Sequence, residues 1–539
     1  MRLDELIAAE EAGENAAIEI SGLAYDSRKV RLGTLFFCVP GFRSDGHDFA
    51  AQAVRDGAVA LVVERPLGLG VPEVVVPSAR AAMGLVAASF YGDPTSQLKV
   101  VGITGTNGKT TTAFLVRALL EAAGEQTGLL GTVTSIVGGQ ERATDWRSTG
   151  SPIGQRTTPE AIDLQAECRA MLDAGDRACA MEVSSHALAL GRTAGVRFAA
   201  AVFTNLTQDH LDYHSTMEDY YQAKRLLFLP TTAADDDEDD VRPGVSVVNV
   251  GDPYGRRLAR ELDGVITFAV DEDDAAGHDD VCREADYRAT DLRCDMAGCR
   301  FTLHTPAGVS EVMLPMPGRF NVANALGALA VVHALGHDLD TLIAGLERGV
   351  HVPGRFESVR AGQAFAVLVD YAHTPDSLQN VLRAARDIAN GRVICVFGAG
   401  GDRDRGKRPA MGEIAARLAD VTVVTSDNPR SEDPEAIVAE IVAGIAPSAV
   451  APGDAASGAA ALEGSVHVEV DRRAAIEQAI ALAEKEDVVV IAGKGHEQGQ
   501  EFAGGVKVPF DDVTVVREVL SASLTDRLSA RNTAVGAGE

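Results

Sequence analysis

The segment 98–124 constrains the fold most strongly, because an apolar run leads into a glycine-rich loop and then into a helix-forming stretch. The run LKVVGIT (98–104) has the pattern of a buried strand, and TTAFLVRALLEAAG (111–124) is typical of a helix. The backbone N–H groups of such a loop, with the positive end of the following helix, can wrap a polyphosphate. The segment therefore predicts a nucleotide-binding loop. Its residues are Gly105, Thr106, Asn107, Gly108, Lys109, Thr110 and Thr111.

Two side chains of this loop carry the predicted chemistry. Lys109 is expected to contact the β- and γ-phosphates of the nucleotide, and the Thr110 hydroxyl to ligate Mg²⁺. The alternative is a chance GKT sequence in a glycine-rich turn, which the strand–loop–helix context disfavours.

Apolar runs alternate with helix-forming stretches along the rest of the chain, which predicts an α/β protein. The runs with strand character include TLFFCVPG (34–41), AVALVVERP (58–66), ACAMEVSS (178–185), VSVVNV (245–250), AVLVDYAH (366–373), RVICVFGAG (392–400), VTVVTSD (421–427) and DVVVIAGKG (487–495). We expect three domains: residues 1–98, residues 99–350 with a central doubly wound sheet of the P-loop ATPase type, and residues 351–539 with a Rossmann-like α/β fold.

Three segments interrupt this pattern. The acidic run 231–244 is expected to be a solvated insertion, with metal binding as the alternative. The alanine- and glycine-rich stretch 446–464 is expected to be a surface insertion, and the tail after about 525 to be flexible.

The composition limits the class of protein. A formal charge of −29 argues against nucleic-acid binding. We find neither a signal-peptide pattern nor an apolar run of the ~18 residues that a membrane span requires, so we expect a cytoplasmic protein without a membrane partner. The seven cysteines lack CxxC spacing and predict buried free thiols. Only eight of the 49 basic residues are lysines, so each lysine calls for inspection.

Polar side chains follow two of the predicted central strands. Glu182 ends the run ACAME (178–182), and His210 lies in TNLTQDHLDYH (204–214) after another apolar run. The carboxyl ends of parallel strands are where open α/β sheets bind their ligands. A carboxylate suits Mg²⁺, whereas an imidazole is a less typical ligand of this ion.

The sequence TGTNGKTTT (104–112) resembles the loop of the Mur ligase and folylpolyglutamate synthetase superfamily, whose members form amides by activating a carboxylate as an acyl phosphate. The resemblance implies that Glu182 and His210 hold metal ions and that Lys224 is carbamylated and supports a second Mg²⁺. Without it, Lys224 in YYQAKRLLF (220–228) would be interpreted as a surface lysine on an amphipathic helix. The resemblance also implies that three residues, Asn321, Arg355 and Asp370, hold the adenine nucleotide of ATP.

The resemblance extends to the substrate-binding segments. YDSRKV (25–30) is similar to the uridine-diphosphate-binding domain of this family, which implies roles for Tyr25 and Ser27. Contacts to the muramoyl-dipeptide part of the substrate are implied for Thr157, Thr158, Ser184 and Arg192. The sequence departs from the family pattern at Leu190, where we expect glutamine in many members.

The C-terminal motifs resemble the diaminopimelate-adding branch of the family. SDNPR (426–430) supplies Arg430, whose planar guanidinium can pair with the distal carboxylate of diaminopimelate through two hydrogen bonds. Lysine has no carboxylate there and would leave the arginine unpaired. The remaining residues that the resemblance places in this pocket are Arg403, Asp427, Asn428, Pro429, Gly493 and Glu497, with Glu497 suited to the distal ammonium.

Together these features predict a monomeric, ATP- and Mg²⁺-dependent ligase of peptidoglycan precursor synthesis. It would join diaminopimelate to the D-glutamyl γ-carboxylate of a UDP-muramoyl dipeptide through an acyl phosphate, with Lys109, Glu182, His210 and Lys224 as catalytic residues. The alternatives are a lysine- or ornithine-adding ligase, a folylpolyglutamate synthetase, and a nucleotide-gated binding protein that has lost catalysis. The SDNPR motif and the N-terminal segment argue against the first two, and the intact catalytic residues against the third.

Overall fold

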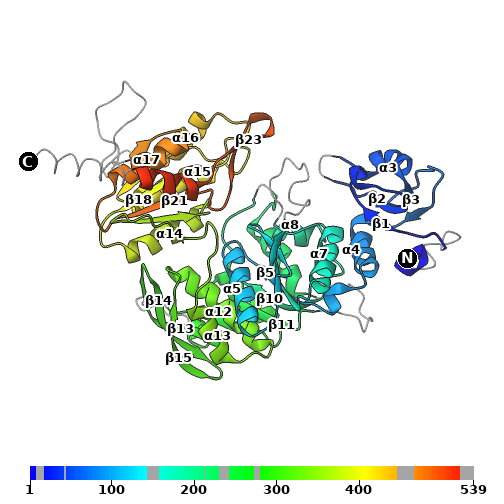
Figure 1. Ribbon diagram of the computed structural model, residues 1–539, viewed down its shortest axis with the longest axis horizontal. Helices are drawn as coiled ribbons and strands as arrows, with labels where there is room; N and C mark the ends of the chain where they lie inside the picture. The colour runs from blue at the N-terminus through cyan, green and yellow to red at the C-terminus, as the bar shows by residue number, and fades with distance from the viewer. Residues whose placement is uncertain are drawn as a thin grey trace, which may run out of the picture.

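The computed structural model describes residues 1–7, 17–41, 44–142, 157–211, 213–229, 242–271, 280–445 and 466–522. Most of the two predicted insertions, 231–244 and 446–464, and the tail after about 525 lie outside these residues. The chain forms three α/β units that follow one another in sequence, with the N-terminal and C-terminal units at opposite ends and the central unit between them (Figure 1).

The N-terminal unit is a four-stranded parallel sheet in the order β1-β2-β3-β4. Its strands are β1 (Gly22–Ala24), β2 (Thr34–Phe37), β3 (Ala58–Val63) and β4 (Glu73–Val75), and its main helices are α3 (Ala50–Asp56) and α4 (Ala79–Phe90). All four residues of β2 are buried, as expected for a strand covered on both faces. Helix α4 packs against α7 (Ala161–Asp173) of the central unit and so joins the two units.

The central unit is an eleven-stranded sheet in the order β15-β14-β13-β12-β11-β10-β5-β9-β6-β7-β8. The seven strands from β13 to β6 in this order run parallel, which confirms the predicted doubly wound core. Their bounds are β5 (Lys99–Thr104), β6 (Thr127–Leu130), β9 (Ala178–Glu182), β10 (Phe198–Phe203), β11 (Val245–Asn249), β12 (Ile266–Val270) and β13 (Tyr287–Asp295). Helices α5 (Lys109–Ala122) and α12 (Arg319–Ala334) pack together on this sheet.

Antiparallel strands extend both edges of the central sheet, which the sequence did not predict. On one edge β7 (Ser135–Val137) and β8 (Gln140–Arg142) follow β6, and on the other β14 (Gly298–Thr305) and β15 (Gly308–Leu314) follow β13. The helices α8 (Ser185–Ala189), α9 (Met217–Arg225), α10 (Pro253–Glu261) and α13 (Leu339–Glu347) complete the unit.

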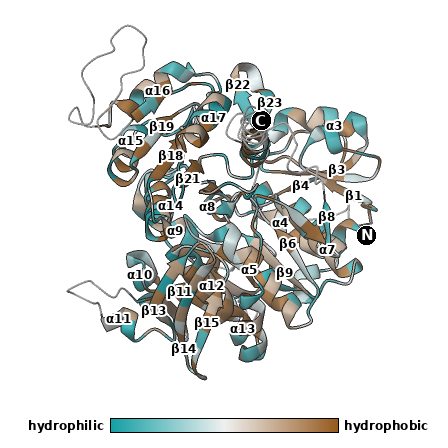
Figure 2. Ribbon diagram, turned by 60° about the vertical axis from the view of Figure 1, so that its left-hand side comes forward, coloured by the Kyte–Doolittle hydropathy of each residue, from teal (hydrophilic) through white to brown (hydrophobic). Residues whose placement is uncertain are grey.

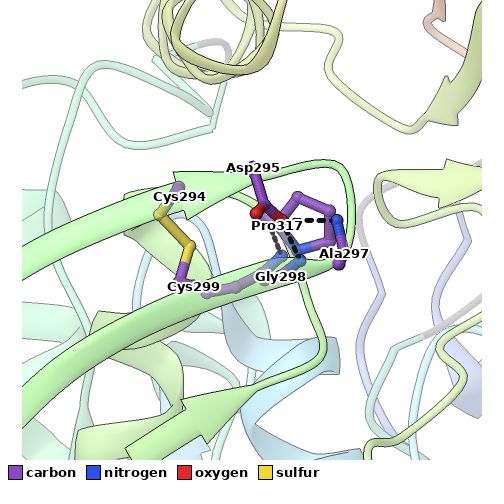
Figure 3. Close-up of a disulfide and its surroundings, with 7 residues drawn as sticks. Cys294, Asp295, Ala297, Gly298, Cys299 and Pro317 are labelled. Carbon is purple, nitrogen blue, oxygen red and sulfur yellow. Dashed lines mark hydrogen bonds between the residues drawn. A yellow bond between two sulfur atoms is a disulfide. The ribbon is translucent and has the colours of Figure 1, made fainter.

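The turn between β13 and β14 corrects the prediction for the cysteines. Cys294 and Cys299 are paired across the two strands and form a disulfide (Figure 3). Four other cysteines are buried free thiols, as predicted, and Cys282 is a half-buried free thiol. The pair was missed because two cysteines five residues apart become neighbours only when the register of the hairpin is known. The disulfide closes the hairpin end, where Cys294 and Met296 pack against the C-terminal core.

The C-terminal unit is a six-stranded sheet in the order β16-β17-β21-β18-β19-β20, parallel except for β16. The strands are β16 (Glu357–Ser358), β17 (Ala366–Asp370), β18 (Val393–Phe397), β19 (Val421–Val424), β20 (Val466–Val468) and β21 (Val488–Ala492). Helices α14 (Pro375–Ile388), α15 (Lys407–Leu418), α16 (Pro434–Val442), α17 (Arg472–Leu482) and 512–522 cover the sheet, whose strands β18 and β21 are strongly apolar (Figure 2). A hairpin of β22 (Gly499–Phe502) and β23 (Val506–Pro509) follows β21.

The sheets and helices follow the predicted three-part α/β organisation, although the domain boundaries at 98 and 350 stay predictions. Among the described residues, no helix combines the length and the apolar character needed to cross a membrane.

Candidate active site

The predicted nucleotide-binding loop connects β5 to α5. Gly105 and Gly108 have φ of 152° and 85°, a region that favours glycine. A Cβ at Gly105 would lie 1.9 Å from Thr204 Oγ1, and one at Gly108 would lie 2.3 Å from Asn324 Oδ1. The loop therefore requires glycine at both positions for conformation and for space.

Lys109 folds back over this loop. Its ammonium donates hydrogen bonds to the carbonyl oxygens of Gly105 and Thr106, both at 2.8 Å. Burial lowers the pKa of Lys109, and the carboxylates of Glu182 and Asp209 oppose this shift. The Lys109 ammonium therefore lies against the loop that is predicted to bind phosphate.

Glu182 ends β9 beside the loop, as predicted. Its Oε2 accepts hydrogen bonds from the hydroxyls of Thr110 (3.0 Å) and Thr132 (3.1 Å), and its Oε1 accepts one from the Thr132 amide (2.8 Å). Glu182 is 2% exposed. Thr132 was missed by sequence reasoning, although its place directly after the buried strand β6 of the same sheet was a usable signal.

His210 lies beside His186 and Asp209. Its ring is 4.9 Å from that of His186, centroid to centroid, and its Nε2 is 3.5 Å from Asp209 Oδ2. Burial raises the pKa of Asp209, but His210, His373 and Lys407 outweigh this and bring it to about 2. The backbone φ of His210 is 56°, in the left-handed region that few residues other than glycine adopt.

Lys224 is buried, so the interpretation as a surface lysine is wrong. Helix α9 directs it toward the nucleotide loop, where its Nζ donates to the carbonyl oxygen of Gly105 at 2.7 Å. The ammonium lies 4.6 Å from the centroid of the Tyr220 ring. Burial and the positive charge of Lys109 hold the pKa of Lys224 well below its usual range. Two lysines therefore converge on one carbonyl group of the loop.

Glu182 and Thr110 offer oxygen atoms that could bind Mg²⁺. Glu182 and Thr110 place oxygen atoms side by side, and Mg²⁺ commonly takes one or two protein oxygens, completing its shell with water and substrate phosphates. Within the described part of the chain, no group of three His, Cys, Asp or Glu side chains has the arrangement of a metal site. The residues thus fit an ion that is shared with a phosphate, and not a site made of protein alone.

The C-terminal unit contacts the nucleotide loop directly. Arg355 Nη2 donates to Thr110 Oγ1 at 3.2 Å, and its guanidinium lies 4.4 Å from the centroid of the Tyr371 ring. Asn107 Nδ2 donates to Asp376 Oδ2 at 2.8 Å. Sequence reasoning missed Tyr371 and Asp376 because their role depends on how the two units meet.

The other two residues predicted to bind ATP contact the backbone. Asp370 accepts hydrogen bonds from the amides of Phe356 and Ala372, both at 2.7 Å, and burial raises its pKa. Asn321 Nδ2 donates to the Pro317 carbonyl oxygen at 2.8 Å. Asp370 therefore supports the segment that carries Arg355.

The residues predicted to bind the muramoyl dipeptide gather next to Glu182. Thr158 Oγ1 donates to the Glu182 carbonyl oxygen (2.9 Å) and accepts from the Ser184 amide (3.0 Å), while Thr157 Oγ1 lies 3.0 Å from Thr132 Oγ1. Arg192 pairs with Glu160 at 3.0 Å. A substrate anion at Arg192 would therefore be held beside an existing ion pair.

Tyr25 and Ser27 lie in the N-terminal unit, apart from this group. The Tyr25 hydroxyl donates to Asp163 Oδ2 on α7 at 2.6 Å, which ties the N-terminal unit to the central one. Ser27 begins a short 3-10 helix (Ser27–Lys29) that Asp26 caps.

A second polar cluster lies at the carboxyl ends of β19 and β21. Asn428 Nδ2 donates to Glu497 Oε2 at 2.8 Å. A Cβ at Gly493, where φ is 117°, would lie 2.4 Å from Asp427 Oδ2. Lys494, which sequence reasoning missed, is fully buried among these residues. The scarcity of lysine was the signal that could have found it.

Arg430 and Arg403 share the other side of this cluster. Arg430 Nε donates to Glu501 Oε2 (2.9 Å) and its Nη1 to the Gly401 carbonyl oxygen (2.7 Å). A Cβ at Gly400 would lie 3.0 Å from Arg430 Nη1 and 3.8 Å from Arg403 Cγ, so both side chains pass this glycine. The main chain at Pro429 approaches Gly401 closely enough to exclude a Cβ there.

Lys407 interacts electrostatically with a carboxylate near the nucleotide loop and with another in the second polar cluster. It begins α15, and burial lowers its pKa, whereas Asp209 near the nucleotide loop and Asp427 in the second cluster raise it. Sequence reasoning passed over this lysine within GDRDRGKRP. The predicted phosphate-binding loop and a cluster of paired charges thus lie on two units that contact each other.

Known protein families and relatives match this chain along most of its length. Three family models match: the Mur ligase family catalytic domain over residues 19–91, the Mur ligase middle domain over 103–332, and the Mur ligase glutamate ligase domain over 354–495. A UDP-N-acetylmuramoyl-L-alanyl-D-glutamate--2,6-diaminopimelate ligase of Geobacillus thermodenitrificans is 45% identical, covering 93% of this chain and 94% of that protein. One of the same name from Streptomyces coelicolor is 45% identical, covering 94% of each.

Solved structures similar to this chain are also Mur ligases. A structure of a UDP-N-acetylmuramoyl-L-alanyl-D-glutamate--2,6-diaminopimelate ligase is 31% identical, with a TM-score of 0.65 and coverage of 97% of this chain and 99% of that one. The MurF ligase of Thermotoga maritima in complex with ADP, at 18% identity, has the same fold, with a TM-score of 0.60 and coverage of 95% and 99%. Fold, motifs and relatives thus lead to one conclusion: the chain belongs to the Mur ligase family of ATP-dependent ligases.

Proposed function

We propose that this enzyme joins diaminopimelate to the D-glutamyl γ-carboxylate of UDP-N-acetylmuramoyl-L-alanyl-D-glutamate, with conversion of ATP to ADP and phosphate. The observation that carries the proposal is the cluster that contains Arg430 and Glu497, which offers a cation and an anion in the C-terminal unit, the unit that also contacts the nucleotide loop through Arg355. A distal carbon that bears both a carboxylate and an ammonium complements this pair. The names of the relatives support the same substrate.

The reaction needs two steps. The substrate carboxylate oxygen attacks the γ-phosphorus of ATP, forming an acyl phosphate and releasing ADP. The amine of diaminopimelate then attacks the acyl carbon, loses a proton, and expels phosphate. The loop amides and Lys109 would bind the phosphates, and Arg355 would approach from the C-terminal unit, so that catalysis consists mainly of positioning and charge neutralisation.

The metal ligands in this proposal are Thr110, Glu182, His210 and a carbamate on Lys224. Mg²⁺, when bound, would neutralise charge on the transferred phosphoryl group. The fit of Lys224 rests on its burial beside Lys109, where desolvation and the positive charge of Lys109 both disfavour a second ammonium. Attack of the neutral amine on CO2 would form an N–C bond and release one proton, so that an anionic carbamate with oxygen ligands would take the place of the ammonium.

The three units have separate roles in this account. Residues 1–98 would bind the uridine diphosphate through Tyr25 and Ser27, residues 99–350 ATP and the dipeptide, and residues 351–539 the amino acid. We also propose that the enzyme is a cytoplasmic monomer that handles small-molecule substrates, without a nucleic-acid or membrane partner.

Release of ADP tests the proposal. With ATP, Mg²⁺ and the UDP-muramoyl dipeptide present, we expect ADP release on addition of diaminopimelate, and little on addition of L-lysine or L-ornithine. Equal turnover with lysine would overturn the assigned amino acid, and no turnover with any amino acid would overturn the ligase activity itself.

A further inference from the structure

Lys494 is a fully buried lysine that joins two loops of the C-terminal unit. Its Nζ donates to Asn428 Oδ1 at 2.9 Å and to Glu497 Oε2 at 3.0 Å, and it lies 3.7 Å from Asp427 Oδ1. The ammonium thus makes two hydrogen bonds, and the carboxylates of Glu497 and Asp427 supply opposite charge. Because a buried charge is costly unless it is paired, these neighbours stabilise the Lys494 ammonium.

The two carboxylate oxygens of Glu497 differ in their hydrogen bonds, and Lys494 contacts only one of them. Oε2 accepts from both Lys494 Nζ and Asn428 Nδ2, at 3.0 and 2.8 Å. In the part of the chain that the structure describes, no donor reaches Oε1, and the Glu497 side chain is 29% exposed. One oxygen is therefore fixed by the protein and the other is available to a ligand.

Asn428 extends the same support to Arg430. Its Oδ1 accepts a second hydrogen bond, from the amide of Glu501 at 3.0 Å. The Glu501 carboxylate in turn holds Arg430 Nε at 2.9 Å. Glu497 is thus paired with the opposite charge of Lys494, and Arg430 with that of Glu501. Lys494 and the Glu501 amide both donate to Asn428 Oδ1.

We propose that Lys494 is a positioning and specificity residue of the amino-acid pocket. By fixing Glu497 Oε2, Lys494 leaves a single carboxylate oxygen for the distal ammonium of the incoming amino acid. It also balances Asp427 and Glu497, two carboxylates that would otherwise place an excess of negative charge beside the distal carboxylate of diaminopimelate. This inference rests on the proposed function and adds the residue that sets the charge of the pocket.

The charge balance predicts a change of preference. Without the Lys494 ammonium, Asp427 and Glu497 offset more of the positive charge of Arg430, so the pocket attracts a distal carboxylate less strongly and a distal ammonium more strongly. Diaminopimelate carries both groups, whereas L-lysine carries only the ammonium. Loss of Lys494 should therefore penalise diaminopimelate more than lysine.

The test is the steady-state kinetics of the full-length variant Lys494→Met, which keeps the length of the side chain and removes the charge. We expect KM for diaminopimelate to rise at least about tenfold, and kcat/KM for diaminopimelate relative to L-lysine to fall by about the same factor. KM for ATP and for the UDP-muramoyl dipeptide should stay within about twofold. The matched control is Lys485→Met, the same chemical change at a side chain that is 78% exposed, which should leave every constant unchanged.

Lys494→Arg, which retains the charge, should recover part of the preference for diaminopimelate, and it carries the test alone if Lys494→Met does not fold. An unchanged KM for diaminopimelate, or equal increases of KM for all three substrates, would overturn the role of Lys494. A wild-type enzyme that does not use diaminopimelate would overturn the proposed function instead, so the two failures are distinguishable.

Discussion

Arg430 offers the sharpest mutational test of the amino-acid pocket. In the structure its Nε is held by Glu501 and one Nη1 hydrogen by the Gly401 carbonyl oxygen. The edge formed by Nη1 and Nη2 therefore remains for a substrate carboxylate. Such an edge can donate two parallel hydrogen bonds, the geometry in which arginine recognises carboxylates most strongly.

The magnitude follows from these two bonds. Hydrogen bonds to charged groups contribute about 1.5 kcal/mol or more each, so the pair should contribute about 3 kcal/mol. Because about 1.4 kcal/mol corresponds to a factor of ten, Arg430→Ala should raise KM for diaminopimelate on the order of 100-fold. KM for ATP should stay within about twofold, because Arg430 is not among the residues at the nucleotide loop.

The backbone at Arg430 requires a control. Its φ is 51°, where alanine is strained but glycine is not. Arg430→Gly removes the same guanidinium without strain, so both variants should lose diaminopimelate binding equally while the glycine variant is the more stable. The assay is ADP release as a function of diaminopimelate concentration. An increase of KM below about fivefold in both variants, or a parallel increase of KM for ATP, would refute this account of the pocket.

Two further predictions concern other parts of the molecule. Lys224→Ala should fold yet lose at least about 100-fold in kcat, with partial rescue by acetate or formate but not by methylamine, and ¹³C-bicarbonate NMR should detect a carbamate in the wild type. An unmodified lysine in a fully active enzyme would contradict this. Hydrogen bonds from Arg408 lower the pKa of Glu432 to about 2, well below the usual range of a glutamate. Because the folded-state pKa is depressed, Glu432 stabilises the fold above pH ~4.5, and this contribution is lost as the pH falls toward 2. Because the Glu432 carboxylate is partly exposed and solvent screens its ion pair, Glu432→Gln should lower the free energy of unfolding by only about 1 kcal/mol at pH 7 and by progressively less below pH ~4.5, as urea denaturation can show.

The sequence predicted what depends on local patterns. The run before Gly105 is a buried strand because its residues are apolar without alternation, and the loop follows because glycine, lysine and threonine stand where a strand gives way to a helix. Glu182 was found for the same reason, since it ends a buried strand.

Features that depend on the meeting of distant segments were not predictable in this way. Cys294 and Cys299 pair because the hairpin register places them opposite each other. Lys224 is buried because α9 packs against the nucleotide loop, whereas its own helix has the composition of a surface segment. Lys494 acquires its role only when the loops after β19 and β21 come together.

The route of the phosphoryl group tests the central claim most directly. The UDP-muramoyl dipeptide can be prepared with ¹⁸O in the D-glutamyl γ-carboxylate and turned over with ATP and diaminopimelate. Because a carboxylate oxygen would bridge carbon and phosphorus in the acyl phosphate, the account predicts that one ¹⁸O atom appears in each released phosphate and that the nucleotide product is ADP. Release of unlabelled phosphate, or formation of AMP and pyrophosphate, would contradict it.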